Sequence, residues 1–325
     1  MLPLAERREL KFPNGFSLRT PLLVPSFSSR VEEIDKVFST CQEFLDCPFL
    51  ISAFDVAKGN LAPPFDFAEA MFLDSGGYEI GPGRELSDVS SEPTGTPQDW
   101  SEKQHSSVLS SWSVGAPTVV VSYDHPLVRQ PIKEQIRRGK KLALPPGSAR
   151  ELLIKPESPT QKFIQIKSVL THVDQMFPFQ AVGVTEKEIG NSVLDRMFNI
   201  ARLRQGLKRA NLNIPIHVFG SLDTITTLFY FVAGADIFDG LTWLRYAFDE
   251  GRTVYRQDFG IREIGIGTKT PSVEATCWSR NYDYMSEMQR EMRRFLNEYE
   301  FNEFKYHRDG LKAAYVSVEE EVKNG

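Results

Sequence analysis

The stretch PIHVFGSLDTITTLFYFVAGADIFDG, residues 215–240, decides the fold. Its two ends, PIHVFG (215–220) and ADIFD (235–239), are short apolar runs bounded by glycine or proline, which is the pattern of buried strands. The segment between them, LDTITTLFYFVAG (222–234), has a helical pattern. A strand, a helix and a second strand in this order predict two parallel strands joined by a right-handed crossover.

The same alternation runs through most of the chain. Further apolar runs predict buried strands at LLVPSF (22–27), FLISAFD (49–55), MFLD (71–74), PTVVVSYD (117–124), LLIKP (152–156) and FQAVGVT (179–185). Helical patterns lie between them in VEEIDKVFSTCQEF, PIKEQIRRGKK, TQKFIQIKSVLTHVDQ and GNSVLDRMFNIARLRQGLKRAN. About eight strands alternating with helices predict an α/β fold, a (β/α)8 TIM-type barrel, over residues 1–270.

Two segments depart from this alternation of strands and helices. Residues 80–116 are rich in Gly, Pro, Ser and Glu, which predicts an exposed insertion after the third strand, with a short helix near residues 101–111. From about Pro271 the chain is helical and charged, which predicts a helical C-terminal appendage over residues 271–325. The apolar stripe between Met288 and Phe304 would either pack back on the barrel or serve a dimer.

Composition narrows the class of protein. The chain has 325 residues, 41% hydrophobic and 25% charged, which suits a globular protein with a full core. No apolar run is long enough to span a membrane, and MLPLAERREL lacks the apolar stretch of a signal peptide. Three cysteines cannot form a disulfide framework, so we expect a cytoplasmic protein that makes no membrane contact.

The net charge does not decide whether the protein binds nucleic acid. A net charge of −5 is not typical of a nucleic-acid-binding protein, but a local basic patch can still contact phosphates. Two segments could form one: RRGKK (137–141) and the basic residues of ARLRQGLKR (201–209). Both could equally be solvated helix faces.

Three predicted strands end in aspartate, at Asp74, Asp124 and Asp239. The C-terminal strand ends of a barrel surround one mouth, where active sites lie, so the three carboxylates would converge there. Aspartate is also common at strand ends because it caps the next turn or helix, and that alternative remains open. The glycines at 76 and 77 after Asp74 would let backbone approach a flat ligand closely.

Four segments together resemble one enzyme family. They are LDSGGYE (73–79), VSYDHP (121–126), AVGVTE (181–186) and HVFGSLDTITTLFYFVAGADIFDGLTWLR (217–245). The family is the tRNA-guanine transglycosylases, and the resemblance extends over about residues 15–265. Its members carry Asp-Ser-Gly-Gly-aromatic after one strand and Gly-x-Asp-x-Phe-Asp, followed by threonine and arginine, after another. The matching residues here are Gly234, Asp236, Phe238, Asp239 and Thr242 to Arg245.

The resemblance implies an exchange of guanine for a 7-deazaguanine base, such as 7-cyano-7-deazaguanine, in DNA or tRNA. Asp239 would be the nucleophile that attacks the ribose C1′, and Asp74 the general acid/base. Asp124 would accept hydrogen bonds from the base, while Tyr78 and Phe219 would stack on it. The resemblance also implies a base pocket completed by Ser75, Gly76, Gly77, Gly183 and Gly220, and nucleic-acid contacts from Arg245 and Arg252.

The residue types suit this chemistry independently. Cleavage of an N-glycosidic bond develops oxocarbenium character at the sugar, which a carboxylate can trap as a covalent intermediate. A second carboxyl group then transfers the proton and needs a raised pKa. We expect neither a metal nor a redox cofactor.

The sequence also departs from the family. Family members carry a zinc site of three cysteines and a histidine, but here only Cys277 and His307 remain. Two ligands fall short of the four that a structural zinc site needs, so we expect no zinc and a buried, apolar Cys277. Lys155 and Pro156 replace a glutamine-glycine pair, which removes one expected base contact, and the proline before threonine-arginine is altered.

Several alternatives stay open. The departures fall where tRNA-type members hold their partner, which favours the DNA-modifying branch. The chain could instead be a non-catalytic, nucleic-acid-binding accessory subunit, or a barrel enzyme that acts on free nucleosides. A homodimer and a helper protein are both compatible with the sequence. His125 follows Asp124 and could lie at the mouth, although a strand-end histidine more commonly hydrogen-bonds only locally; His217 is most simply a surface or core residue.

Overall fold

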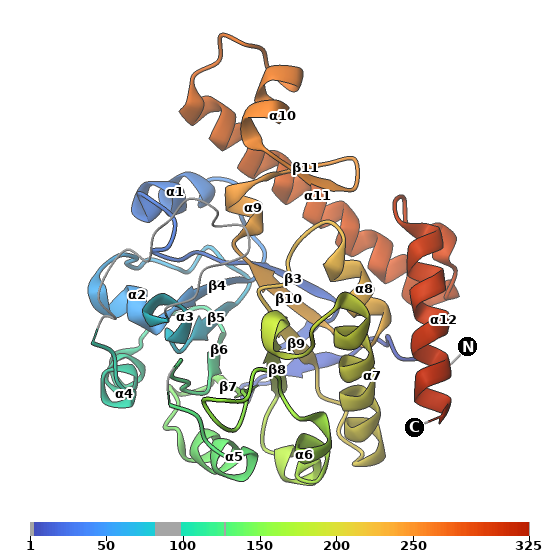
Figure 1. Cartoon of the computed structure of the whole chain (residues 1–325). Coiled ribbons are helices and arrows are strands. Elements are labelled where there is room, and N and C mark those ends of the chain that lie inside the picture. The colour runs from blue at the N-terminus through green and yellow to red at the C-terminus, as the bar shows by residue number, and fades with distance from the viewer. Residues whose placement is uncertain (1–2, 82–98, 127, 325) are drawn as a thin grey trace.

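The computed structural model describes residues 3–81, 99–126 and 128–324. Its centre is a parallel sheet in the order β3-β10-β9-β8-β7-β6-β5-β4, and a parallel bridge from Ser26 to Leu50 brings its two edges together (Figure 1). The strands are β3 Leu22–Pro25, β4 Phe49–Ser52, β5 Met71–Asp74, β6 Thr118–Val121, β7 Ala149–Ile154, β8 Ala181–Thr185, β9 Ile216–Phe219 and β10 Ile237–Gly240. The predicted (β/α)8 barrel is confirmed.

The described residues also form helices, most of which surround the barrel (Figure 1). They are α1 Ile34–Cys41, α2 Ala53–Lys58, α3 Gly77–Ile80, α4 Glu102–Ser111, α5 Ile132–Lys141, α6 Ile166–Leu170, α7 Val193–Arg209, α8 Thr226–Val232, α9 Thr242–Arg245, α10 Arg256–Glu263, α11 Thr270–Glu298 and α12 Arg308–Asn324. The helix predicted over residues 160–175 is shorter than expected. The Thr171 hydroxyl donates to the Ser168 carbonyl oxygen at 2.7 Å, a local bond that competes with helix continuation.

The insertion after the third strand is described only in part. Residues 82–98 lie outside the described residues. The short helix predicted near residues 101–111 is present as α4, whose first turn is capped by the Ser101 side chain.

The strands are apolar because they are buried on both faces. Every residue of β4, β5 and β6 is buried, as expected for parallel strands with helices outside and side chains inside the barrel. Leu22, Phe72 and Ile237 belong to the cluster of inward-facing residues. The hairpin formed by β1 (Glu9–Lys11) and β2 (Ser17–Arg19) adds Leu10 and Leu18 to this cluster and so closes the N-terminal end of the barrel.

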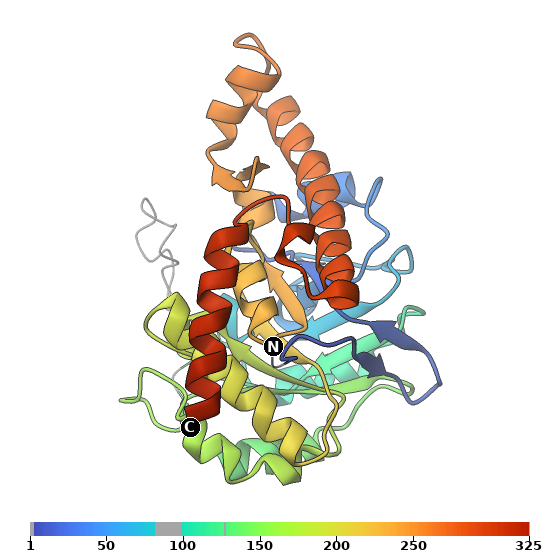
Figure 2. The same ribbon diagram turned by 90° about the vertical axis from the view of Figure 1, so that its right-hand side faces the viewer.

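The C-terminal helices pack on the barrel. Met288, Met292 and Phe295 of α11 belong to the main hydrophobic core, and the Gln289 side chain donates to the Pro21 carbonyl oxygen. The apolar stripe near Met288 therefore packs back on the barrel, one of the two predicted outcomes. Figure 2 shows α10 and the start of α11 extending beyond the barrel, while α12 lies along α7. Among the described residues, no helix has both the length and the apolar character needed to cross a membrane.

Arg204, one of the basic residues of segment 201–209 that could have formed a phosphate-binding patch, is a core residue. Arg204 is only 2% exposed, and its guanidinium bonds the carboxylate of Asp236. Arg8 contacts the other oxygen of the same carboxylate at 3.0 Å. Arg204 therefore does not belong to a surface patch formed by the basic segment 201–209, because its guanidinium is buried and paired with Asp236.

Candidate functional site

Two carboxylates lie at the C-terminal mouth of the barrel. Asp74 ends β5 and Asp239 lies near the end of β10; the residues are 8% and 5% exposed. Each follows an inward-facing residue of its strand by two positions, Asp74 after Phe72 and Asp239 after Ile237, so both side chains also face the inside of the barrel. β6 ends earlier than predicted, at Val121, and Asp124 follows three residues later. The three aspartates meet at one end of the barrel because the strands are parallel.

The environment of Asp74 favours its protonated form. Burial raises the pKa of Asp74, the charge of Asp124 raises it further, and the charge of Asp239 adds to this, to a pKa of about 7. Backbone N–H groups of the following turn oppose the shift, and the Gly76 N–H lies 3.2 Å from the Asp74 carboxylate. A carboxyl group with this pKa can both give and take a proton near neutral pH.

The two glycines after Asp74 make room for side chains of the protein itself. Gly76 has a φ of +93°, and a Cβ there would lie 2.5 Å from the Cβ of Phe54. A Cβ on Gly77 would lie 2.5 Å from a carboxylate oxygen of Asp124. The Asp-Ser-Gly-Gly turn therefore lets Asp124 lie directly against the backbone that follows Asp74.

The carboxylate of Asp239 is held on both of its oxygens. The Ser26 hydroxyl donates to Oδ2 at 2.7 Å, and the Gly220 N–H donates to Oδ1 at 3.0 Å. Gly220 itself has a φ of +77°, which favours glycine at this turn. These donors come from the ends of β3 and β9, the strands on either side of β10.

His217 also contacts Asp239, although the sequence suggested only a surface or core residue at this position. Its Nε2 lies 3.2 Å from Asp239 Oδ1, and its Nδ1 lies 2.9 Å from Glu151 Oε1. Burial alone lowers the pKa of His217, but Glu151 and Asp239 outweigh it and raise the pKa to about 9. The signal in the sequence was Glu151, a charged residue directly before the apolar run LLI, although Arg150 beside it is charged as well.

Asp124 and Ser75 lie together, with Lys155 beside them. The Ser75 hydroxyl donates to Asp124 Oδ1, and the Lys155 ammonium lies 3.4 Å from Oδ2 and 3.0 Å from Glu188. Burial lowers the pKa of Lys155, but Asp124 and Glu188 outweigh it and the pKa is raised. The lysine that replaces the expected glutamine is thus a cation beside Asp124.

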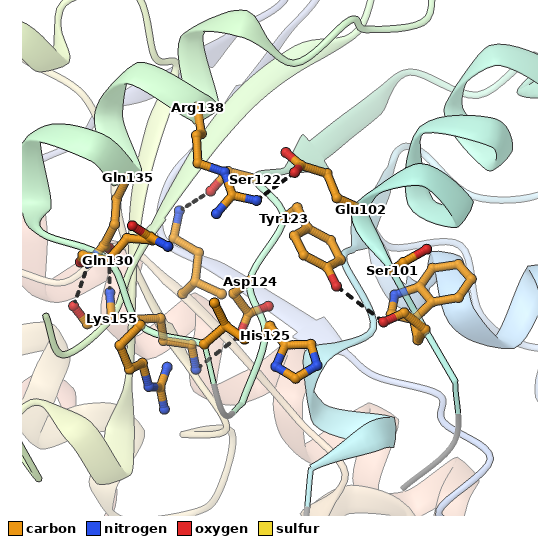
Figure 3. A pocket seen from close by; sticks show the side chains of 14 residues that line it. Ser101, Glu102, Ser122, Tyr123, Asp124, His125, Gln130, Gln135, Arg138 and Lys155 are labelled. Atoms are coloured by element: carbon orange, nitrogen blue, oxygen red, sulfur yellow. Dashed lines mark hydrogen bonds and ion pairs between the residues drawn. The ribbon is translucent and has the colours of Figure 1, made fainter. Parts of the chain in front are cut away.

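A cavity of about 280 Å³ adjoins Asp124 (Figure 3). Its wall contains aromatic, anionic and cationic side chains, among them Trp100, Glu102, Tyr123, His125, Arg138 and Lys155. In Figure 3, Lys155 and Asp124 face each other at one side of the cavity, and Glu102 pairs with Arg138 at another. The cavity therefore offers both hydrogen-bond donors and acceptors to a ligand.

The two aromatic residues expected to stack on a base already have partners on one side. The guanidinium of Arg30 lies 5.1 Å from the centre of the Tyr78 ring. The Phe219 ring stacks on His217 with centroids 3.8 Å apart, in space left by Gly183, where a Cβ would lie 2.9 Å from Glu151. Gly183 thus makes room for the Phe219 ring, which a Cβ at this position would overlap.

The two expected nucleic-acid contacts lie in different surroundings. Arg245 ends α9, is partly buried, and has a guanidinium nitrogen 3.5 Å from the Tyr78 hydroxyl, next to the mouth. Arg252 is exposed on strand β12 (Arg252–Val254), which forms a hairpin with β11 (Ala247–Asp249). Arg245 therefore lies beside Tyr78, whereas Arg252 lies on an exposed hairpin.

The resemblance drew attention to Cys277 and His307, which match two of the four zinc ligands of the transglycosylases. Cys277 is buried with Ala247 and Phe259, as the interpretation of an apolar cysteine predicted. His307 Nε2 lies 2.7 Å from the Gly251 carbonyl oxygen. Within the described ranges, no group of three or more His, Cys, Asp and Glu side chains is arranged to hold a metal ion.

Comparison with known proteins adds no family. The chain matches no protein-family model, and no curated protein matches it. The roles considered for Asp74, Asp124 and Asp239 therefore depend on the sequence motifs and on the geometry of the barrel mouth.

Proposed function

We propose that this protein is a guanine transglycosylase, which exchanges guanine for a 7-deazaguanine base in DNA or tRNA through a covalent intermediate on Asp239. The observation that carries the proposal is the pair of buried carboxylates at one mouth, Asp74 and Asp239, in different environments. Asp239 is held by two hydrogen-bond donors, and the pKa of Asp74 is raised by burial and by Asp124 to about 7.

This difference suits the two roles that base exchange requires. Asp239 attacks C1′ of the nucleotide, and the bond from C1′ to the base breaks. Asp74 gives its proton to the departing base and later takes one from the incoming base, which then displaces Asp239 from C1′. In other enzymes that cleave glycosidic bonds, different environments give two carboxyl groups different pKa values, and this difference distinguishes the acid/base from the nucleophile.

The surroundings of Asp124 support a base with adjacent hydrogen-bond donors and acceptors. Asp124 supplies acceptor oxygens, and Lys155 supplies a donor 3.4 Å away. The Watson–Crick edge of guanine carries N–H donors next to its O6 acceptor, so one guanine-like base could bond both side chains. Lys155 would then take over the contact that was expected to be lost with the glutamine.

The test is incorporation of labelled guanine and of 7-cyano-7-deazaguanine by the purified chain. Bulk tRNA, single-stranded DNA, duplex DNA and free guanosine are offered in parallel. We expect label to enter one polymer and Asp239→Asn to abolish both turnover and the covalent adduct. Asp258→Asn, at an exposed carboxylate of α10, is the matched control and should keep full activity.

Each other result points to a different function. Exchange into guanosine alone would mean that the substrate is a free nucleoside and not a polymer. No exchange into any substrate would overturn the proposal and favour a non-catalytic binding subunit.

A further inference from the structure

Three charged residues form a row inside the barrel, beneath the mouth. Glu151 comes from β7, His217 from β9 and Asp239 from β10, and all three side chains are almost wholly buried. The imidazole lies between the two carboxylates, 2.9 Å from Glu151 and 3.2 Å from Asp239. Nδ1 is hydrogen-bonded to Glu151, whereas Nε2 lies at ion-pair distance from Asp239 without the geometry of a hydrogen bond. A neutral imidazole that donates Nδ1–H to Glu151 would turn the lone pair of Nε2 toward Asp239, so both contacts are favourable only when the imidazole is protonated.

The remaining surroundings of His217 are apolar. β5 presents the edge of the Phe72 ring, with centroids 5.5 Å apart, and β9 presents the stacked ring of Phe219. β8 presents Gly183, which pairs with His217 in the sheet. Among the described residues packed around the imidazole, the charged groups that face it are thus Glu151 and Asp239. A cation enclosed in this way is stabilised by these two anions alone.

The two oxygens of Asp239 are not equivalent. Oδ1 accepts the Gly220 N–H and faces His217, whereas among the residues that the structure describes Oδ2 accepts the Ser26 hydroxyl alone. A lone pair is therefore more accessible on Oδ2. Oδ1 lies where a cation and a backbone N–H can stabilise it as the carbonyl oxygen of an ester.

We propose that His217, held in place by Glu151, is a positioning residue that fixes Oδ1 of Asp239 so that Oδ2 attacks the sugar. This inference rests on the function proposed above. The bond from Oδ2 to C1′ forms while the bond from C1′ to the base breaks. The electron pair leaves with the base, which takes its proton from Asp74. In the second half the incoming base bonds C1′, loses a proton to Asp74, and the pair of the breaking ester bond returns to Oδ2. His217 keeps its protons throughout.

The charge of His217 can be measured without any assay of activity. The chain has five histidines, so ¹⁵N-histidine NMR spectra are simple, and the spectrum of His217→Gln identifies the His217 signals. We expect both ring nitrogens of His217 to be protonated at pH 7.5 and to lose a proton only near pH 9. Glu151→Gln removes one of its two anionic partners, so the proton should be lost at lower pH.

Kinetics then test the positioning role. His217→Gln retains a hydrogen-bond donor but not the charge, so we expect kcat to fall by roughly 10²-fold, with little change in KM. The Asp74 titration is common to wild type and Glu151→Gln and cancels in the ratio of their kcat values. We expect this ratio to fall as pH rises from about 7 to about 9, because His217 loses its proton earlier in the variant; a merely structural residue would leave the ratio independent of pH. His172→Gln, on the outside of the barrel, is the matched control and should behave as wild type.

The outcomes separate the two proposals. A neutral His217 at pH 7.5, or a His217→Gln variant with kcat within about twofold of wild type, would overturn the positioning role alone. Inactivity of the wild-type chain on every substrate would overturn the proposed function and this role with it. If His217→Gln does not fold, the histidine signals displaced in the spectrum of Glu151→Gln identify His217, because Glu151 contacts its Nδ1. The wild-type NMR titration and the Glu151→Gln pH–rate profile then still decide the question.

Discussion

Burial decides the chemistry of individual residues in this barrel. Asp74 and His217 are both buried, yet the pKa of each is raised for a different reason. For Asp74 burial and neighbouring carboxylates both oppose ionisation, whereas for His217 neighbouring carboxylates overcome burial. One acidic mouth therefore favours a neutral acid at Asp74 and a charged base at His217.

The raised pKa of Asp74 makes stability depend on pH. Its pKa is about 7 in the folded chain and near 3.8 ordinarily, so its contribution is complete below 3.8 and is lost as pH rises through 7. Between these values wild type should lose about 1.4 kcal/mol per pH unit from this group. We expect Asp74→Asn to be more stable relative to wild type at pH 8 than at pH 5, measured by urea unfolding. An equal difference at both pH values would contradict this.

A second buried histidine gives a stability prediction of opposite sign. His105 of α4 is wholly buried, and within the described part of the chain neither ring nitrogen has a hydrogen-bond partner. Burial lowers its pKa to about 4, so its contribution is complete above 6.5 and is lost as pH falls through 4. His105→Phe has a similar size and no polar atoms, and we expect it to be neutral or to stabilise by about 1 kcal/mol. Urea unfolding at pH 7 and pH 4 checks this, with a larger gain expected at pH 4.

At the scale of elements, the turn between β5 and α3 is the most constrained segment of the site. Its glycines fit between Phe54 and Asp124, so this turn fixes the position of Asp124 as well as that of Asp74. The sequence suggested that the glycines make room for a ligand, and in the structure their space is used by the protein.

A pair of glycine substitutions separates backbone strain from steric overlap. Gly76 and Gly59 both have positive φ, but a Cβ on Gly76 meets Phe54 whereas a Cβ on Gly59 meets nothing within 4 Å. We expect Gly59→Ala to cost about 1 kcal/mol through strain alone. Gly76→Ala should cost about 1–3 kcal/mol more because Phe54 must move. Thermal or urea unfolding would show the difference, and equal losses would mean that the overlap relaxes freely.

At the scale of the whole molecule, the C-terminal helices complete the outer layer of the barrel. The boundary at residues 270 and 271 remains a prediction, but α11 and α12 contribute to the same core as α7 and α8. Residues 1–270 alone would expose that core, so we expect this fragment not to fold independently. A cooperative unfolding transition of the fragment would contradict this.

Two substitutions in this part of the chain test the same point without truncation. Phe295 is wholly buried in α11, whereas Ile266, before α11, is 90% exposed. We expect Phe295→Ala to destabilise the whole protein by about 3–5 kcal/mol. Ile266→Ala, the control, should change stability by about 0.5 kcal/mol or less. Both are measured by the midpoint of a single unfolding transition.

The sequence by itself determined the barrel and part of its site. Apolar runs such as MFLD and ADIFD could only be strands buried on both faces, and their alternation with helices required parallel pairing. Because parallel strands end at the same mouth, the aspartates at positions 74 and 239 were expected together, and they lie there. These features depend on local pattern, which is visible in a single sequence.

Only the tertiary structure decided which distant charges meet. His217 and Glu151 are 66 residues apart, and Arg204 and Asp236 are 32 apart. Lys155 and Asp124 come from separate loops. Sequence periodicity cannot predict such pairs, because their contacts form only when the barrel closes. A buried charge is then stable only when it is paired with another charged or polar group. The closed barrel therefore decided that His217 lies against Asp239, that Lys155 lies beside Asp124, and that Arg204 is a core residue.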